Sequence, residues 1–253
     1  MQASLPNYDY LYLGDNARAP YGSRSFDTVY EYTLECVNHL FKNGCELVIL
    51  ACNTASAKAL RTIQQIDLPL IDSKKRVLGV IRPTTEIVGN YTKTKQIGIF
   101  ATSGTVSSQS YIIEIEKFFP DVKIFQEACP MWVPLIENNE LQSKGAAYFV
   151  KKHVKNLFLQ SPNIDTIILG CTHYPLLKPL IEQHLPKNTT ILTQGTIVAN
   201  SLKDYLLRHP DMENLISKNN TLQFLTTDSA ELFDKQASLF FEKEVKSKHL
   251  SLG

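Results

Sequence analysis

Short apolar runs alternate with helix-period segments along this chain. Runs rich in Val, Ile and Leu predict strands over residues 8–13, 46–51, 77–81, 96–100, 122–126, 165–170, 190–192 and 222–225. Segments 25–41 and 143–159 carry apolar residues three and four positions apart, which predicts amphipathic helices between strands. Uninterrupted apolar strands alternating with helices are typical of parallel sheets covered by helices, so the pattern indicates an α/β fold.

Two of these strand–helix units look like copies of one another. Residues 47–54 read Leu-Val-Ile-Leu-Ala-Cys-Asn-Thr, and residues 166–173 read Thr-Ile-Ile-Leu-Gly-Cys-Thr-His. The duplication favours two similar parallel-sheet α/β domains with the active site in the cleft between them. We assign residues 1–81 plus 195–253 to the first domain and residues 82–194 to the second.

The carboxyl-terminal region carries a helix-start signal and a charged end. Asp228 and Glu231 form an Asp-x-x-Glu pattern ahead of an apolar stripe, which predicts a capping box. The lysine-rich stretch 243–248 alternates with glutamate, and we interpret it as an exposed helix followed by a tail.

Composition excludes several classes of protein. The formal charge of +1 gives no electrostatic reason to expect nucleic acid or an anionic membrane as a partner. Residues 1–9 lack the basic start and apolar centre of a signal peptide, and no stretch reaches the roughly 20 apolar residues of a membrane span. Five cysteines without a Cys-x-x-Cys pair predict free thiols in a cytoplasmic, reducing compartment.

The two cysteines that follow matching strands are the main candidates for chemistry. Cys52 and Cys171 are predicted at the carboxyl ends of parallel strands, where open α/β sheets form ligand crevices. The helix after each cysteine points its amides at the thiol and favours the thiolate, which would lower the pKa towards neutrality. Two such thiols facing one pocket act as base and acid on opposite faces of a small molecule. The alternative for Cys52 is a buried core residue.

Other residues near these strand ends fit the same pocket. His173 can stabilise a thiolate or transfer a proton, or it can simply cap the helix in which Pro175 occupies the first turn. Residues 101–105 (Ala-Thr-Ser-Gly-Thr) offer hydroxyls and amides to a carboxylate. No Gly-rich phosphate loop and no metal-ligand cluster occurs, so we expect neither a cofactor nor a metal. Cys36, Cys45 and Cys129 are interpreted as packing residues.

Taken together, the motifs resemble the cofactor-independent glutamate racemases of the aspartate/glutamate racemase superfamily. The matching stretches are 14–22 (Gly-Asp-Asn-Ala-Arg-Ala-Pro-Tyr-Gly), 51–55 (Ala-Cys-Asn-Thr-Ala), 101–105, 128–130 (Ala-Cys-Pro) with Glu137, and 170–176 (Gly-Cys-Thr-His-Tyr-Pro-Leu). They occur in the family's order and cover nearly the whole chain.

The resemblance implies conversion of L-glutamate to D-glutamate for peptidoglycan, without pyridoxal phosphate. It places Cys52 and Cys171 on opposite sides of the substrate Cα, with His173 assisting Cys171 as the third catalytic residue. The substrate-binding residues that it implies are Tyr21, Gly22, Asn53, Thr54, Thr102, Thr105, Thr172, His173 and Glu137. Glutamate is the only partner expected, besides a second copy of the chain, since family members often form homodimers.

One departure from the family pattern changes the expectation for activity. Family members begin with a strand that ends in Asp-Ser-Gly, and no Asp-Ser-Gly precedes Cys52 here. Residues 1–6 match the end of the family's first helix, so we expect weak racemase activity or none, and reduced stability. Alternative readings are a racemase for aspartate or another small acid, a truncated non-catalytic glutamate-binding homologue, and a dithiol redox protein, whose sulfurs would need to lie within bonding distance.

Overall fold

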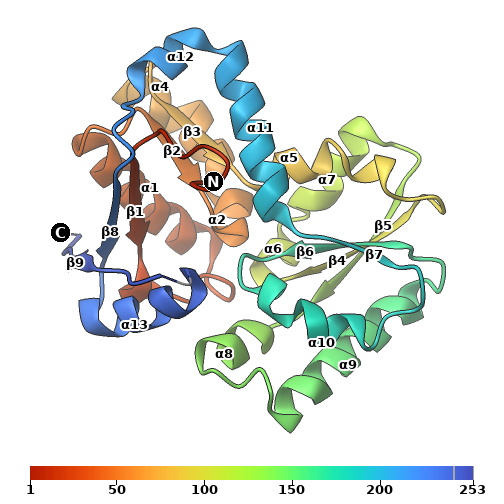
Figure 1. The fold of residues 1–253 in the computed structure, drawn as a ribbon. Coiled ribbons are helices and arrows are strands. Elements are labelled where there is room, and N and C mark those ends of the chain that lie inside the picture. Colours follow the sequence, from red (N-terminus) through yellow and green to blue (C-terminus); the bar gives the residue numbers. More distant parts are fainter. Residues whose placement is uncertain (242, 253) are drawn as a thin grey trace.

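The computed structural model describes residues 1–241 and 243–252, and it forms two α/β lobes joined side by side (Figure 1). The second lobe is built on a four-stranded parallel sheet in the order β5-β4-β6-β7. The first lobe contains two parallel sheets, β1-β8-β9 and β2-β3. The strands are β1 (Tyr10–Gly14), β2 (Leu47–Leu50), β3 (Arg76–Gly79), β4 (Gln96–Ala101), β5 (Lys123–Ala128), β6 (Thr166–Gly170), β7 (Thr190–Leu192), β8 (Leu222–Thr226) and β9 (Ser247–His249).

Helices lie between most of the strands and cover the sheets. The α-helices are α1 (Phe26–Lys42), α2 (Asn53–Lys58), α3 (Leu60–Thr62), α4 (Leu68–Ile71), α5 (Ile81–Thr85), α6 (Ser103–Ser107), α7 (Ser110–Phe118), α8 (Trp132–Glu137), α9 (Lys144–Gln160), α10 (Lys178–Glu182), α11 (Gln194–Arg208), α12 (Pro210–Leu215) and α13 (Ala230–Phe241). Shorter turns are the 3₁₀ segments η1 (Asn16–Arg18), η3 (Val88–Asn90) and η4 (Tyr174–Leu177) and the π segment η2 (Ile63–Asp67).

The two long helices predicted from periodicity are confirmed, together with the reason that they start where they do. Ser25 accepts a hydrogen bond from the Thr28 amide at the start of α1, and Ser143 accepts one from the Ala146 amide at the start of α9. A serine in this position satisfies a backbone donor that the first helical turn leaves without a partner.

The second lobe has the more continuous core because helices cover both faces of its sheet. Every residue of β6 is buried, as the uninterrupted run of apolar residues predicted. Ile167 and Leu169 pack towards α8, α9 and η4, whereas Ile168 packs towards α5 and α7. The alternation follows from the two-residue period of a strand. The carboxyl end of β6, where Cys171 follows, is therefore held rigidly.

The predictions for the carboxyl-terminal region are partly wrong. The lysine-rich stretch is not a helix with a tail: β9 pairs with β8 in parallel, and Val245 just before it is buried. The capping box is also wrong. The Ser229 hydroxyl, not Asp228, accepts the hydrogen bond from the Leu232 amide, and the Asp228 carboxylate binds the Ser229 amide.

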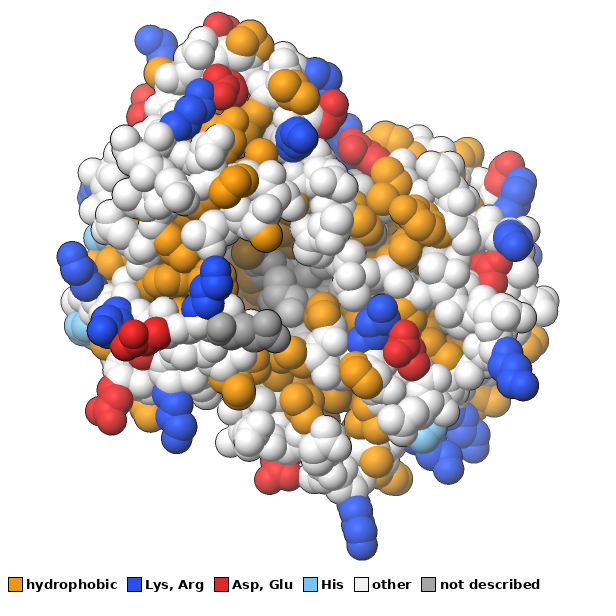
Figure 2. All heavy atoms as spheres, viewed as in Figure 1, with side chains coloured by type: hydrophobic (Ala, Val, Ile, Leu, Met, Phe, Trp, Pro, Cys, Tyr) orange, Lys and Arg blue, Asp and Glu red, His pale blue; other side chains and the backbone are white. Residues whose placement is uncertain are grey.

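The first lobe is divided between its two sheets. One edge of β1 pairs with β8 and one edge of β2 pairs with β3, and no strand of the described residues pairs with the other edge of either. Apolar side chains of both strands line a cavity between them. Figure 2 shows a hollow on this face with apolar side chains around it. Both lobes are therefore built from parallel strands, but the second lobe has one continuous sheet and the first lobe has two separate sheets.

The residue bounds of the two predicted domains stay a prediction. Residues 242 and 253, which we assigned to the first domain, lie outside the described residues. Among the helices that the structure describes, none combines the length and apolar character needed to cross a bilayer.

Asp165 offers a test of how the second lobe is held together. Its carboxylate accepts hydrogen bonds from the Thr92 hydroxyl at 2.6 Å and from the amides of Lys93 at 2.7 Å and Thr94 at 2.9 Å. Partial burial acts to raise the pKa of Asp165, but these hydrogen bonds outweigh it and lower the pKa. We expect Asp165→Ala to reduce the free energy of unfolding by about 1–2 kcal/mol in urea titrations at neutral pH.

The pH dependence of that loss follows from the direction of the shift. A lowered carboxyl pKa stabilises the fold at pH values above its unfolded pKa of about 4, and the effect disappears as the pH falls through the folded pKa. The difference between wild type and variant should therefore shrink near pH 2. Asp121→Ala is the matched control, because Asp121 is exposed and only pairs with Lys95 at 3.3 Å. Equal losses for both variants would contradict the prediction.

Candidate active site

Cys52 lies at the junction of β2 and α2, in the first lobe. Cys52 is the N-cap residue of α2, and its side chain is exposed to the cavity. Enclosure by the surrounding protein raises the pKa of the Cys52 thiol, against the amides of Ala55 and Thr54 and the Thr54 hydroxyl, which lower it. The sequence-based expectation that the helix amides dominate the pKa of Cys52 is wrong, because desolvation is the larger effect.

Cys171 occupies the equivalent position in the second lobe, between β6 and η4. It is almost fully buried, and burial raises the pKa of its thiol to about 12, although the amides of His173 and Tyr174 favour the thiolate. Negative charge on Cys52 raises the pKa of Cys171 further. Two thiolates at once are therefore disfavoured, and an ionised site holds one thiolate facing one thiol.

His173 and Glu137 form a chain of polar groups that ends at Cys171. His173 Nδ1 lies 4.0 Å from Cys171 Sγ, and His173 Nε2 lies 3.3 Å from Glu137 Oε1. Glu137 is the last residue of α8, so this chain lies wholly within the second lobe. When Nε2 carries the ring hydrogen and donates a hydrogen bond to Glu137, Nδ1 has a free lone pair and can take the proton of the thiol. Cys52 has no comparable imidazole partner among the described residues.

Three threonine hydroxyls meet where the lobes touch. Thr54 Oγ1 of the first lobe lies 2.8 Å from Thr102 Oγ1 and 3.3 Å from Thr105 Oγ1 of the second lobe. Thr102 also accepts a hydrogen bond from the Thr105 amide as the N-cap residue of α6. Hydroxyls rotate and can donate or accept, so the cluster can adapt to a bound carboxylate.

Gly22 allows the loop after η1 to approach α6 closely. Its carbonyl accepts a hydrogen bond from the Gly104 amide at 2.8 Å, and a Cβ at Gly22 would lie only 3.0 Å from Thr102 Cβ. The neighbouring Tyr21 donates its hydroxyl to the Asp15 carboxylate. Burial, and then this hydrogen bond to Asp15, raise the pKa of Tyr21, so it stays a donor.

Comparison with known proteins finds relatives over nearly the whole chain. The model of the Asp/Glu/Hydantoin racemase family matches residues 1–201. A protein named glutamate racemase from Sulfurihydrogenibium sp. (strain YO3AOP1) is 36% identical to this chain, over 99% of this chain and 90% of the relative. A protein of the same name from Roseobacter denitrificans is 38% identical, over 97% of this chain and 92% of the relative.

The chain belongs to the glutamate racemases of the Asp/Glu/Hydantoin racemase family.

Solved structures extend the similarity of this racemase to its whole fold. Glutamate racemase isoform RacE1 from Bacillus anthracis superposes with a TM-score of 0.88 at 30% identity, over 99% of this chain and 91% of that one. The glutamate racemase from Francisella tularensis in complex with D-glutamate gives a TM-score of 0.85 at 27% identity, over 99% and 90%. The predicted family resemblance and the two-lobed α/β fold are confirmed.

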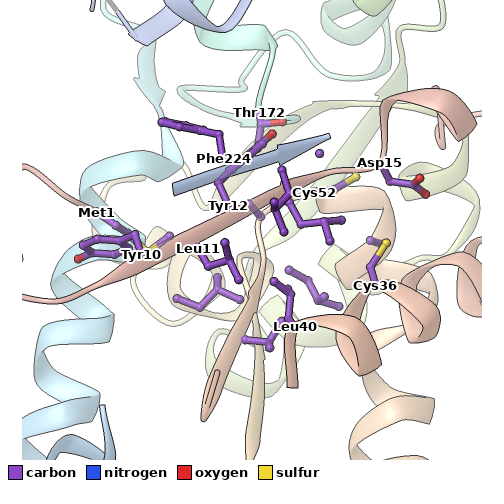
Figure 3. A pocket seen from close by; sticks show the side chains of 18 of the residues that line it. Met1, Tyr10, Leu11, Tyr12, Asp15, Cys36, Leu40, Cys52, Thr172 and Phe224 are labelled. Carbon is purple, nitrogen blue, oxygen red and sulfur yellow. The ribbon is translucent and has the colours of Figure 1, made fainter. Parts of the chain in front are cut away.

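In this racemase, one cavity of about 1370 Å³ brings together the predicted residues of both lobes. Of the predicted residues, those that line it are Tyr21, Gly22, Cys52, Asn53, Thr54, Thr102, Glu137, Cys171, Thr172 and His173. Figure 3 labels Cys52, Thr172 and Tyr12 of β1 among the residues that line this pocket. Thr105 is the exception: it is fully buried and connects to the cavity only through the hydroxyls of Thr54 and Thr102.

Three polar residues in or next to the racemase cavity were not among the sequence-based candidates. Asp15 follows β1 and accepts hydrogen bonds from Arg18, Tyr21 and Thr227. Its position after a strand repeats the signal that identified the two cysteines, so it could have been found. Tyr111 and Gln194 bind Asn53 from distant parts of the chain, and no sequence signal marks them.

Proposed function

We propose that this racemase interconverts L-glutamate and D-glutamate by proton transfer between Cys52, the substrate Cα and Cys171. The observation that carries the proposal is that Cys52 and Cys171, which follow matching strands β2 and β6 of the two lobes, line the same cavity, as do Cys36, Cys45 and Cys129. The curated relatives are named glutamate racemases, and the structure from Francisella tularensis holds D-glutamate. D-Glutamate for peptidoglycan is the product that the family resemblance implies.

In the proposed reaction one cysteine, as thiolate, accepts the α-proton, and the electron pair of the C–H bond passes into the substrate carboxylate. The opposite thiol then delivers its proton to the other face of Cα, so one thiolate and one thiol are present before and after the reaction. The reverse reaction exchanges their roles. Because an α-proton is very weakly acidic, groups that stabilise the developing carboxylate charge must lower much of the barrier.

The roles of the remaining residues follow from their places in the cavity. His173, held by Glu137, assists proton transfer at Cys171. Thr54, Thr102 and Thr172 offer hydroxyls to the substrate, supported by Thr105 behind them. Tyr21, Gly22 and Asn53 complete the proposed binding residues. This mechanism uses side chains alone. A homodimer and a cytoplasmic location stay predictions from the sequence.

Proton NMR of L-glutamate in D₂O tests the proposal directly. We expect the Cα–H signal to disappear and D-glutamate to accumulate, without any added cofactor. Turnover should be slow, because a cavity of about 1370 Å³ exceeds the roughly 300–1,000 Å³ of ordinary ligand pockets and restrains a small substrate weakly. Exchange with aspartate in preference to glutamate, or no exchange with either from folded protein, would contradict the proposed function.

A further inference from the structure

Asn53 belongs to a closed ring of buried hydrogen bonds. Its Nδ2 donates to Gln194 Oε1 at 2.8 Å, Gln194 Nε2 donates to the Tyr111 hydroxyl oxygen at 2.9 Å, and Tyr111 donates to Asn53 Oδ1 at 2.7 Å. All three side chains are at most 8% exposed. Each group both donates and accepts within the ring, so the three hydrogen bonds strengthen one another.

A backbone carbonyl fixes the direction of this ring. Gln194 Nε2 also donates to the Val80 carbonyl at 2.9 Å, with a longer contact of 3.3 Å to the Thr84 hydroxyl. A carbonyl only accepts, so the Gln194 amide cannot be flipped without losing this bond. Its oxygen must then face Asn53, and Tyr111 must donate to Asn53 Oδ1.

The ring leaves Asn53 one donor to offer. An amide nitrogen carries two hydrogens, and Gln194 takes only one of those on Asn53 Nδ2. The described residues make no hydrogen bond to the other, and Asn53 borders the cavity between Cys52 and Thr54. A free N–H at this place suits an anionic group such as a carboxylate, and a flipped amide would present its oxygen there instead.

We propose that Tyr111 and Gln194 are positioning residues that lock the Asn53 amide with an N–H directed at a substrate carboxylate. The inference rests on the proposed function and deepens it, since neither residue lines the cavity itself. Tyr111 lies in α7 of the second lobe and Gln194 begins α11, so the orientation of a first-lobe residue depends on the second lobe. Burial of Tyr111 raises its pKa, which keeps it a donor at working pH.

A double-mutant cycle between Tyr111→Phe and Asn53→Ala tests the proposal. We expect Tyr111→Phe to raise KM for glutamate about tenfold, with kcat changed less, because a binding group loses its orientation. In the Asn53→Ala background the same change should add less than about twofold, since Tyr111 acts through Asn53. Additive effects, or an unchanged KM in Tyr111→Phe, would overturn the proposal. Tyr30→Phe is the control, because its hydroxyl binds only the remote Asp67.

The Asn53 side-chain amide gives a readout independent of turnover. In ¹⁵N NMR of the full chain, we expect the two Nδ2 hydrogens of Asn53 to exchange slowly with solvent. In Tyr111→Phe we expect the same hydrogens to exchange with solvent rapidly. Rapid exchange in the wild type would overturn the locked orientation. A wild-type protein that does not racemise glutamate contradicts the proposed function, whereas the amide signals still decide whether the ring locks Asn53.

Discussion

Replacing either Cys52 or Cys171 with alanine is expected to lower the rate of racemisation about 1,000-fold in both directions. Each thiol serves one face of the substrate Cα, so losing one removes the base in one direction and the acid in the other. General acid–base groups contribute typically about 10²–10⁴-fold, which sets the size of the effect. Circular dichroism follows the loss of ellipticity as one enantiomer of glutamate becomes the racemate. Starting from L-glutamate and then from D-glutamate gives the rate in each direction.

The double variant and a thiol control make this prediction specific. Because the two cysteines act as a unit, Cys52→Ala with Cys171→Ala should be little slower than either single variant. Cys45→Ala removes a half-buried thiol that lines the cavity and packs against the first-lobe core, but it does not follow a strand end, and it should leave the rate unchanged. A single-cysteine variant that keeps more than a tenth of the wild-type rate would show that its thiol is not required.

A steep alkaline rise is expected in the pH profile of kcat/KM. Desolvation in the cavity raises the pKa of Cys52 above its ordinary value, and burial raises that of Cys171 to about 12, so both thiols are mostly protonated at neutral pH. The active form carries one thiolate, and below the pKa its fraction grows about tenfold with each pH unit. We therefore expect kcat/KM to increase close to 100-fold between about pH 7 and pH 9.

The sign of this dependence follows from which form is active. A raised thiol pKa means that protons must leave before catalysis, so activity is lost as the pH falls and gained as it rises. Unfolding curves at each pH separate this effect from loss of structure. A flat profile above pH 7 would mean that Cys52 already ionises near neutrality, and the amides of α2 would then outweigh burial in solution.

Much of the fold could be predicted from the sequence because its strands are apolar on both faces. The run 166–170 shows why: Ile167, Ile168 and Leu169 point to alternate faces, and each face is covered by helices. A continuous apolar run is then required, and it is readable without knowledge of partners. The two cysteine sites were readable for the same reason, since each follows such a run.

Features that depend on distant partners could not be predicted. In β9 the residues Ser247, Lys248 and His249 carry no apolar signal, and their backbone pairing with β8 alone makes them a strand. The start of α13 was misjudged because Ser229 and Asp228 are both good caps, and only the local backbone selects between them. Gln194 lies 141 residues from Asn53, so their hydrogen bond leaves no trace in local sequence.

The two thiols have unequal surroundings, but thermodynamics fixes the ratio of kcat/KM in the two directions of the reaction. L- and D-Glutamate have equal free energies in water, so kcat/KM must be the same in both directions whatever the enzyme does. His173 and Glu137 serve Cys171 alone, and the site is therefore asymmetric around a symmetric reaction. That asymmetry can appear only as compensating differences in kcat and KM. The enantiomer with the lower KM must also be the one with the lower kcat.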